Sequence, residues 1–197
     1  LLLFAVFFAI VGARLYYVAF SWDHYKDNLL SIFNLRQGGL AIYGGIIGAF
    51  TTVYFFAKKR KLSFGEMLDT ACPGLAAGQV IGRWGNFFNE EAHGYATDLP
   101  WAQIINGVGY HPTFLYESIW CFLLFIFLMW FSNNKRAFSG QIICLYAILY
   151  SVERFFVESF RTDSLMVGPL RQAQVISIVI IIVCLMLYVF LNKKQKK

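Results

Sequence analysis

Long apolar stretches separated by short polar segments dominate this sequence. Five are almost free of charged residues: Leu1–Phe20, Ala41–Ala57, Thr113–Phe131, Phe138–Val157 and Ala173–Leu191. A sixth, at about Phe64–Gly82, contains Glu66, Asp69, Pro73 and Gln79. Because a helix needs roughly 20 apolar residues to cross a bilayer, the pattern predicts about six transmembrane helices. The polar side chains of the sixth helix must then be shielded from lipid by protein.

The composition favours the same class. The chain has 197 residues, of which 58% are hydrophobic and only 14% are charged. A soluble domain of this size cannot bury so much apolar surface, and a disordered chain is far more polar. We therefore expect residues 1–197 to form one integral membrane domain, an all-α polytopic transmembrane helix bundle. We expect no nucleic acid partner.

Three basic clusters predict the orientation of the helices. They are Lys58–Lys61, Lys135–Arg136 and the four lysines of 193–197, which together hold ten of the seventeen basic residues. Cytoplasmic loops carry an excess of such residues, so we place all three clusters and the C-terminus in the cytoplasm. The segments 21–40, 83–112 and 158–172 then lie outside. We expect 83–112 to form a small outer loop or head.

The remaining basic residues differ in kind from the clusters, because six of the seven are arginines. They are Arg14, Lys26, Arg36, Arg83, Arg154, Arg161 and Arg171. A guanidinium binds phosphate or carboxylate through two parallel hydrogen bonds, whereas lysine acts as a point charge. We interpret the outer arginines as the type that binds an anionic group.

Polar residues from four predicted helices converge near the outer face. They are Tyr43, Arg83, Asn86, Asn89, Glu91, His111, Tyr116, Glu117, Tyr150, Glu153, Arg154 and Glu158. Ionisable residues inside a membrane usually face a cavity or a partner, so this convergence predicts a functional site. The structural alternative is ion pairing, such as Arg154 with Glu158 one turn later. The three histidines lack metal-ligand spacing, so we expect no metal and no cofactor.

Other small and polar residues favour structural roles. The pairs Gly44-x-x-x-Gly48 and Gly78-x-x-x-Gly82 are typical of close helix packing. We expect Glu66 and Asp69 to pair with the basic loop that precedes them. The four cysteines lie in apolar stretches and form no CxxC pair, which favours free, buried thiols over disulfides or structural zinc.

The segment 82–94 reads GRWGNFFNEEAHG and carries a specific resemblance. It resembles the prolipoprotein diacylglyceryl transferase family, whose signature is G-R-x-G-N-F-x-N-x-E-x-x-G, at every fixed position. Gly12–Tyr17, Gly38–Gly45, His111–Glu117 and 150–163 are similar to further family motifs in order and spacing. Many relatives have His where Tyr43 stands, and a Tyr hydroxyl is a poor base at neutral pH. The family usually has seven spans, so one further N-terminal span would reconcile the two counts.

The resemblance implies an alkyl transfer in the bacterial cytoplasmic membrane. The diacylglyceryl group of phosphatidylglycerol passes to the lipobox cysteine thiol of a prolipoprotein signal peptide, forming a thioether and releasing glycerol 1-phosphate. This is the first step of lipoprotein maturation, and the active site would face the outer leaflet. The implied partners are phosphatidylglycerol, the prolipoprotein and the bilayer.

Residue roles follow from the motifs and from the charge that develops on the leaving phosphate, which needs fixed cationic donors. The expected catalytic residues are Arg83, Arg154, His111, Tyr43 and Glu91. The expected phosphatidylglycerol-binding residues are Arg83, Asn86, Asn89, Gly94, Arg154, Glu158 and Arg161. The base that takes the thiol proton is left open among His111, His24, Glu91 and Tyr43.

Two other classes of protein fit parts of the pattern. A phospholipid carrier or flippase would also need an anionic-headgroup site near the outer leaflet, but it would leave phosphatidylglycerol whole. A structural scaffold would need the arginines for folding alone. The product of the reaction separates the first of these from an enzyme, and the folding of arginine variants separates the second.

The cysteines of the chain give a first test, because the implied substrate brings its own sulfur. Replacing Cys72, Cys121, Cys144 and Cys184 together by alanine should leave transfer to a lipobox peptide near its original rate. The measurement is the rate of peptide modification followed by mass spectrometry. A folded but inactive quadruple variant would show that the enzyme itself supplies a thiol.

Overall fold

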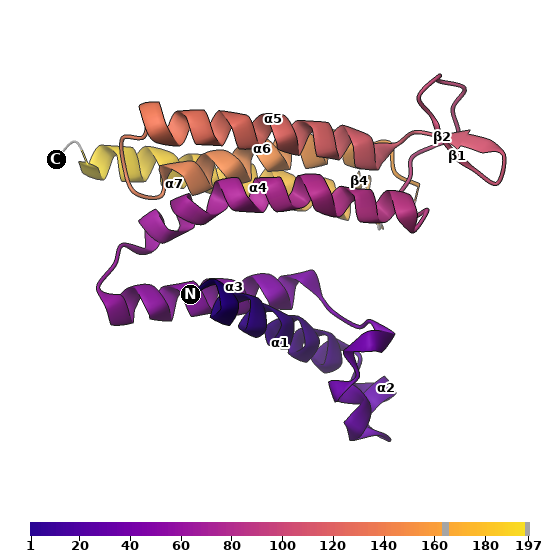
Figure 1. Ribbon diagram of the computed structural model, residues 1–197, viewed down its shortest axis with the longest axis horizontal. Helices are drawn as coiled ribbons and strands as arrows, with labels where there is room; N and C mark the ends of the chain where they lie inside the picture. The colour runs from indigo at the N-terminus through magenta and orange to yellow at the C-terminus, as the bar shows by residue number, and fades with distance from the viewer. Residues whose placement is uncertain (163–165, 196–197) are drawn as a thin grey trace. The chain divides into compact units, whose positions relative to one another are not determined.

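Six long helices lie where the six apolar stretches predict them. The computed structural model describes residues 1–162 and 166–195. The long helices are α1 (Leu2–Phe20), α3 (Ile42–Arg60), α4 (Phe64–Phe88), α5 (Thr113–Asn134), α6 (Gln141–Glu158) and α7 (Gln172–Gln195) (Figure 1). Within the described residues, α1, α5 and α7 are long and apolar enough to cross a membrane. The chain is thus a mainly helical membrane protein, and the expected all-α class is confirmed.

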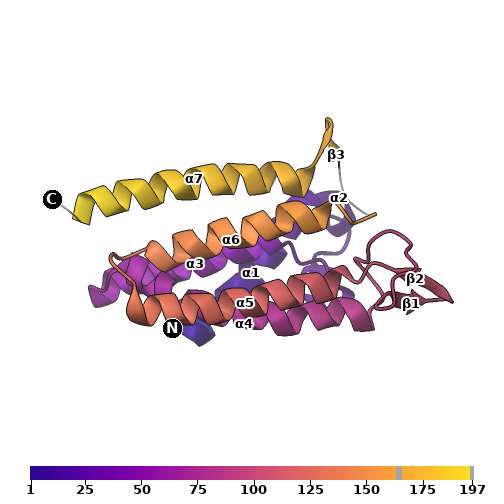
Figure 2. The same cartoon turned by 90° about the horizontal axis from the view of Figure 1, so that it is seen from above.

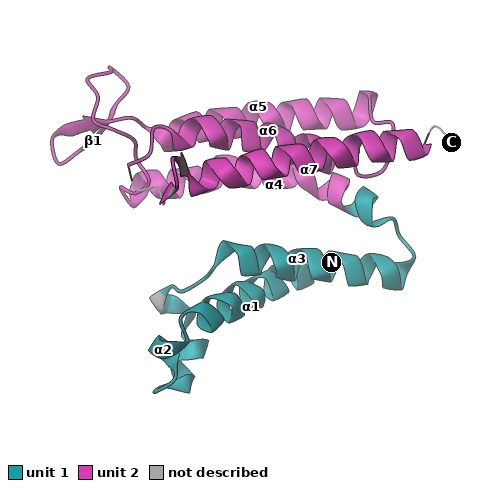
Figure 3. Ribbon diagram, turned by 180° about the vertical axis from the view of Figure 1, so that it is seen from behind, with its two compact units in different colours: residues 1–67 teal, residues 68–197 magenta. Residues whose placement is uncertain are grey.

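The chain divides into two compact units, residues 1–67 and 68–197, which Figure 3 colours separately. In the first unit, α1 and α3 run antiparallel. They are joined by α2 (Trp22–Tyr25) and two short 3-10 helices, η1 (Leu29–Phe33) and η2 (Leu35–Gln37). The second unit contains most of α4 together with α5, α6 and α7, which lie side by side in Figure 2.

Glycines let the backbones of α1 and α3 touch. A Cβ added to Gly12 would meet the carbonyl oxygen of Gly44, and one added to Gly48 would meet that of Phe8. The packing role predicted for the Gly44–Gly48 pair is therefore confirmed. Within the second unit, a Cβ on Gly78 or Gly82 meets no described atom within 4 Å, so this pair makes no close contact inside its own unit.

Arg14 organises the polar connection between these two helices. Its side chain is buried on α1, and its Nε, Nη1 and Nη2 atoms donate five hydrogen bonds of 2.7–3.0 Å. The acceptors are the carbonyl oxygens of Ser31, Ile32, Asn34, Gly38 and Gly39. A guanidinium has five N–H groups, so this set accounts for all of them. The expectation that Arg14 binds an external anion is wrong, because the donors hold the loop.

The core of the second unit lies where α4, α5 and α6 meet. Cys72 and Ala76 of α4 pack in one buried cluster with Leu124, Leu128 and Ile142. The polar Gln79 of α4 is satisfied inside this interface, since its Oε1 accepts from the Tyr146 hydroxyl at 2.9 Å. The predicted shielding of the polar residues of α4 is thus confirmed at Gln79.

Asp69 of α4 caps the start of α6. Its carboxylate is buried and accepts from the backbone N–H groups of Gly140 at 2.8 Å and Ile143 at 2.9 Å. An anion at a helix N-terminus pairs with the unsatisfied N–H groups and the helix dipole. Arg136 lies 3.3 Å from the same carboxylate. The predicted structural role is confirmed, but the basic partner of Asp69 comes from the loop before α6 rather than from 58–61.

The segment after α4 contains a short hairpin. Strands β1 (Gln103–Ile105) and β2 (Val108–Tyr110) pair antiparallel, with Gln103 opposite Tyr110. Asn106 and Gly107 form the turn, and both have positive φ, as a two-residue hairpin of this type requires. A second pair, β3 (Met166–Val167) and β4 (Leu170–Arg171), precedes α7. The expected loop region therefore has a hairpin, but α4 runs to Phe88, six residues beyond the predicted end of that span.

The glycine contact in the first unit gives a matched pair of substitutions. Gly48→Ala should destabilise the protein by about 1–3 kcal/mol, because the added methyl group would force α1 and α3 apart. Gly78→Ala should be neutral or stabilise by roughly 0.5–1 kcal/mol, because alanine favours helix and its methyl meets no atom. Thermal unfolding in detergent measures both. Equal effects of the two variants would contradict the close contact.

Candidate functional site

One buried carboxylate joins three helices of the second unit. Glu117 of α5 is 1% exposed. Its Oε2 lies 3.0 Å from Nη1 of Arg83 on α4, and its Oε1 lies 2.5 Å from Nη1 of Arg154 on α6. Two guanidiniums that come from helices distant in sequence are therefore fixed on opposite oxygens of one carboxylate. The predicted convergence of Arg83 and Arg154 is present in the structure.

Further contacts fix each guanidinium. Arg154 Nη2 pairs with Glu158 Oε2 at 2.8 Å, and Arg83 Nη2 donates to the Tyr150 hydroxyl at 3.0 Å. The ion pair that the structural alternative requires, Arg154 with Glu158, is thus formed. This pair does not explain why Arg83, on a different helix, lies next to Arg154. The contacts of Arg83 with Glu117 and Tyr150 hold it there.

The two guanidiniums remain more accessible than the carboxylates that hold them. The Arg83 and Arg154 side chains are 19% and 21% exposed, whereas those of Glu117 and Glu158 are 2% and 5% exposed. Each guanidinium has five N–H groups, and two of its nitrogens make the contacts above. The arrangement can therefore offer remaining donors to an anion while the buried carboxylates keep both cations in position.

The end of α4 carries the rest of the motif. Asn86 is half-buried one turn after Arg83, so both share one side of the helix. Asn89 and Glu91 are exposed on the following turn, and the Asn89 side-chain amide donates to Glu91 Oε1 at 3.2 Å. Asn86 thus lies on the same side of α4 as Arg83, whereas Asn89 and Glu91 pair with each other on the surface.

Gly94 lies where three segments meet. Its N–H donates to the carbonyl oxygen of His111 at 2.9 Å, and it forms a β-bridge with Arg161. A Cβ on Gly94 would lie 2.7 Å from that of His111 and 3.0 Å from the Phe160 carbonyl oxygen. Only glycine fits there without a shift. Gly94 therefore positions His111 and Arg161, which are both candidate site residues, next to each other.

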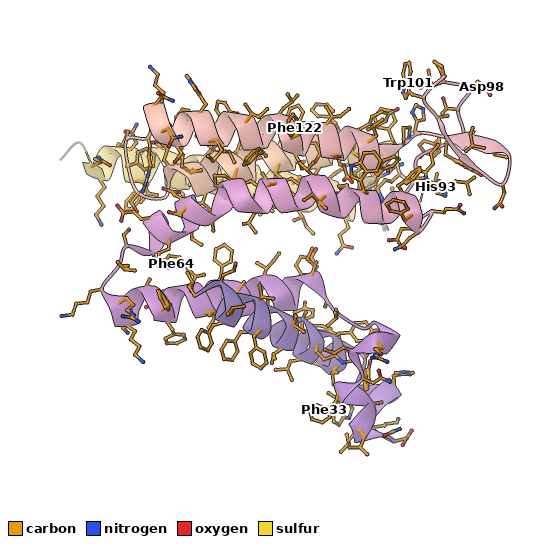
Figure 4. The ribbon with its side chains drawn as sticks, in the orientation of Figure 1. Phe33, Phe64, His93, Asp98, Trp101 and Phe122 are labelled. Carbon is orange, nitrogen blue, oxygen red and sulfur yellow. The ribbon has the colours of Figure 1, made fainter. Side chains whose placement is uncertain are left out.

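His111 is held at the start of α5. Its Nδ1 lies 3.2 Å from the Tyr116 hydroxyl, which also accepts from Trp101 Nε1 at 3.2 Å. The ring packs against Phe160 at 5.3 Å between centroids. Figure 4 shows His93 close to the end of α4 and Trp101 and Asp98 on the loop that leads into the hairpin. A half-buried His111 with a fixed ring is a suitable candidate base.

Two residues expected near the site have other described contacts. Tyr43 belongs to the first unit, where it is exposed and its ring lies 6.4 Å from that of Tyr16. Arg171 donates from Nη2 to the Tyr95 hydroxyl at 2.6 Å, so it fastens β4 to the segment before the hairpin. The described residues include no group of three or more histidines, cysteines or acids that would hold a metal ion. All four cysteines are free, and three are buried.

Sequence reasoning placed Glu117 and Tyr150 in the polar convergence at the outer face but gave neither residue a catalytic or binding role. Both lie in the matched motifs, but neither residue type by itself indicates that it holds a guanidinium. A signal was present, because a buried acid in an apolar helix needs a cationic partner, and Glu117 lies near the start of the apolar helix α5. The pairing with two arginines at once needed the geometry of three helices.

The bridging carboxylate should be essential for stability. Glu117→Gln removes the buried charge that two half-buried guanidiniums share, and breaking a buried ion pair on one side costs about 3–5 kcal/mol. Thermal unfolding in detergent should show a large loss of stability. Glu90→Gln, at an exposed position after α4, is the control and should change little. If Glu117→Gln were as stable as the control, the bridge would not hold the helices.

Comparisons with known proteins agree on one family. The family model described as prolipoprotein diacylglyceryl transferase matches residues 1–190. The phosphatidylglycerol–prolipoprotein diacylglyceryl transferase of Finegoldia magna is 54% identical over 194 residues, covering 98% of this chain and 78% of the relative. The protein of the same name from Clostridioides difficile is 52% identical, covering 95% and 75%. That of Bacillus cytotoxicus is 48% identical, covering 98% and 76%. The chain belongs to the prolipoprotein diacylglyceryl transferase family.

Proposed function

We propose that this protein transfers the diacylglyceryl group of phosphatidylglycerol to a prolipoprotein, the first step of lipoprotein maturation. Membership of the family, at up to 54% identity to the relatives above, supports the reaction. The observation that carries the mechanism is the pair of guanidiniums, Arg83 and Arg154, that Glu117 fixes on two oxygens of one carboxylate.

The phosphate of phosphatidylglycerol binds to this pair. Two partly exposed guanidiniums present fixed N–H donors, which suit the bidentate recognition of a phosphodiester. Asn86 adds a neutral donor from the same side of α4. Glu158 orients Arg154, and Arg161 lies beside Gly94 at the neighbouring β-bridge, where it guides the anionic headgroup.

The transfer is a displacement at carbon. The lipobox sulfur attacks the glycerol carbon of the diacylglyceryl group, a carbon–sulfur bond forms, and the carbon–oxygen bond to the phosphate breaks. The electron pair of that bond goes to the leaving glycerol 1-phosphate. Arg83 and Arg154 stabilise the negative charge that develops on the leaving phosphate. Because Glu117 fixes both guanidiniums before the reaction, they need little reorganisation in the transition state. The thiol proton passes to a base among His111, His24, Glu91 and Tyr43.

The substrate thiol reacts as a thiolate. A free cysteine thiol has a pKa near 8.5, so only a few per cent is ionised at neutral pH. Nearby guanidiniums favour the thiolate, and a base next to them speeds its formation. His111, fixed by Tyr116 and Phe160, is the half-buried candidate, whereas Glu91 is exposed and paired with Asn89.

The distribution of charge in the second unit supports the orientation. The end of α4, the start of α5 and the end of α6 carry the arginine cluster and lie at the same end as the hairpin (Figure 1). The basic segment 135–136, between α5 and α6, and the end of α7 with Lys193 and Lys194 lie at the opposite end. With the basic end in the cytoplasm, all six long helices cross the membrane, the C-terminus is cytoplasmic and the site faces the outer leaflet.

Substitution of the arginines tests the function. Purified protein in phosphatidylglycerol vesicles is given a lipobox peptide, and mass spectrometry follows the peptide while an enzymatic assay follows glycerol phosphate. Arg83→Ala and Arg154→Ala should each lower the rate by about 10²-fold or more, as loss of a transition-state donor does. Arg154→Lys should rescue poorly, because an ammonium cannot make the two-pronged contact. Arg60→Ala, on α3, is the matched control.

The alternatives give different results in the same assay. A carrier would bind phosphatidylglycerol but give neither a modified peptide nor glycerol phosphate. A scaffold role would make the loss of activity in Arg83→Ala follow its loss of folded protein, with the folded fraction turning over at the wild-type rate. Normal turnover by folded Arg83→Ala would rule out the proposed phosphate contact.

A further inference from the structure

Glu153 is a buried carboxyl group that no described donor reaches. It lies on α6 between Tyr150 and Arg154, and it is only 3% exposed. Neither of its carboxyl oxygens has a hydrogen-bond partner among the residues that the structure describes. Buried polar groups without a partner are rare in folded proteins, so each one calls for a physical explanation. The proposed reaction mechanism does not use this side chain.

The groups that face Glu153 come from all three helices of the arginine cluster. They are Arg83 of α4, Glu117 and Cys121 of α5, and Tyr150 and Arg154 of α6. Both guanidiniums are close enough to act on Glu153 electrostatically. Their described contacts, however, go to Glu117, Tyr150 and Glu158. Glu153 therefore lies beside two cations without receiving a hydrogen bond from either.

The charge balance of the cluster favours a neutral Glu153. The two positive charges of Arg83 and Arg154 are already matched by the carboxylates of Glu117 and Glu158. An ionised Glu153 would be a third negative charge, buried and without a donor. Such an arrangement is strongly disfavoured compared with a neutral acid of the same shape.

We propose that Glu153 is a positioning residue that stays protonated and so keeps the arginine pair able to accept a phosphate. This inference rests on the proposed function, in which that phosphate belongs to phosphatidylglycerol. With Glu153 neutral, the anionic phosphodiester binds to a cluster in which two arginines balance two carboxylates, those of Glu117 and Glu158. With Glu153 ionised, three carboxylates compete with the phosphate for two guanidiniums. Loss of the Glu153 proton therefore weakens the binding of phosphatidylglycerol. It does not change which residues act in the step that breaks the carbon–oxygen bond.

The variant Glu153→Gln separates these two states, because glutamine keeps the shape of the acid and stays uncharged at every pH. The measurement is KM for phosphatidylglycerol as a function of pH, over the range in which both proteins stay folded. In the wild-type protein KM should rise about tenfold with pH. In Glu153→Gln it should stay flat and match the low-pH value of the wild type. In both proteins kcat should rise as the substrate thiol ionises.

A matched control uses another glutamate. Glu66 lies in the first turn of α4, where it is exposed, and it is not part of the candidate site. Glu66→Gln should keep the wild-type rise in KM with pH. If Glu153→Gln showed the same rise as this control, the titration would belong to another group and the proposal would be overturned.

Infrared spectroscopy tests the protonation directly and needs no activity. The difference spectrum of wild type minus Glu153→Gln at neutral pH should show the carbonyl stretch of a protonated carboxylic acid. If Glu153→Gln does not fold, the infrared spectrum of the wild-type protein is recorded as a function of pH. The band of the protonated acid should then disappear over the same pH range in which KM rises or binding to phosphatidylglycerol vesicles weakens. Carboxylate bands in place of the acid band would overturn the proposal. A protein with this band but no transfer activity would contradict the proposed function instead.

Discussion

The carboxylate of Glu117 is the contact on which the arrangement of α4, α5 and α6 depends. It is almost fully buried and receives one guanidinium from each neighbouring helix, Arg83 on one oxygen and Arg154 on the other. None of these three charges is stable in an apolar interior without the others. The same constraint that holds the helices together therefore sets the positions of the two cations that the proposed reaction needs.

Arginine has opposite uses in the two units. Arg14 directs its N–H groups at five backbone carbonyl oxygens and thereby fixes a loop, whereas Arg83 and Arg154 are held by side chains at their inner edge and stay partly exposed. Residue type alone does not separate these roles. The distinction lies in the acceptors around each guanidinium: η1, Asn34 and the glycines at 38 and 39 present backbone carbonyl oxygens to Arg14.

The lengths of the apolar stretches were sufficient to predict the six long helices, because a membrane-spanning helix needs roughly 20 apolar residues in a row. The motif at 82–94 located Arg83, and the acids and arginines at the end of α6 located Arg154. The sequence did not reveal that Glu117 bridges them, that Asp69 caps α6, or that α4 continues to Phe88. The Glu117 bridge and the Asp69 cap depend on contacts between residues 34 to 74 positions apart, which no local pattern encodes.

The most direct test of the central claim is a structure of the protein in lipid nanodiscs with phosphatidylglycerol bound. The account predicts phosphate oxygens within hydrogen-bonding distance, about 2.7–3.2 Å, of guanidinium nitrogens of both Arg83 and Arg154. Glu117 should still lie between the two arginines. A headgroup phosphate bound elsewhere, with both guanidiniums engaged by protein side chains alone, would contradict the account and leave the cluster as a structural ion-pair network.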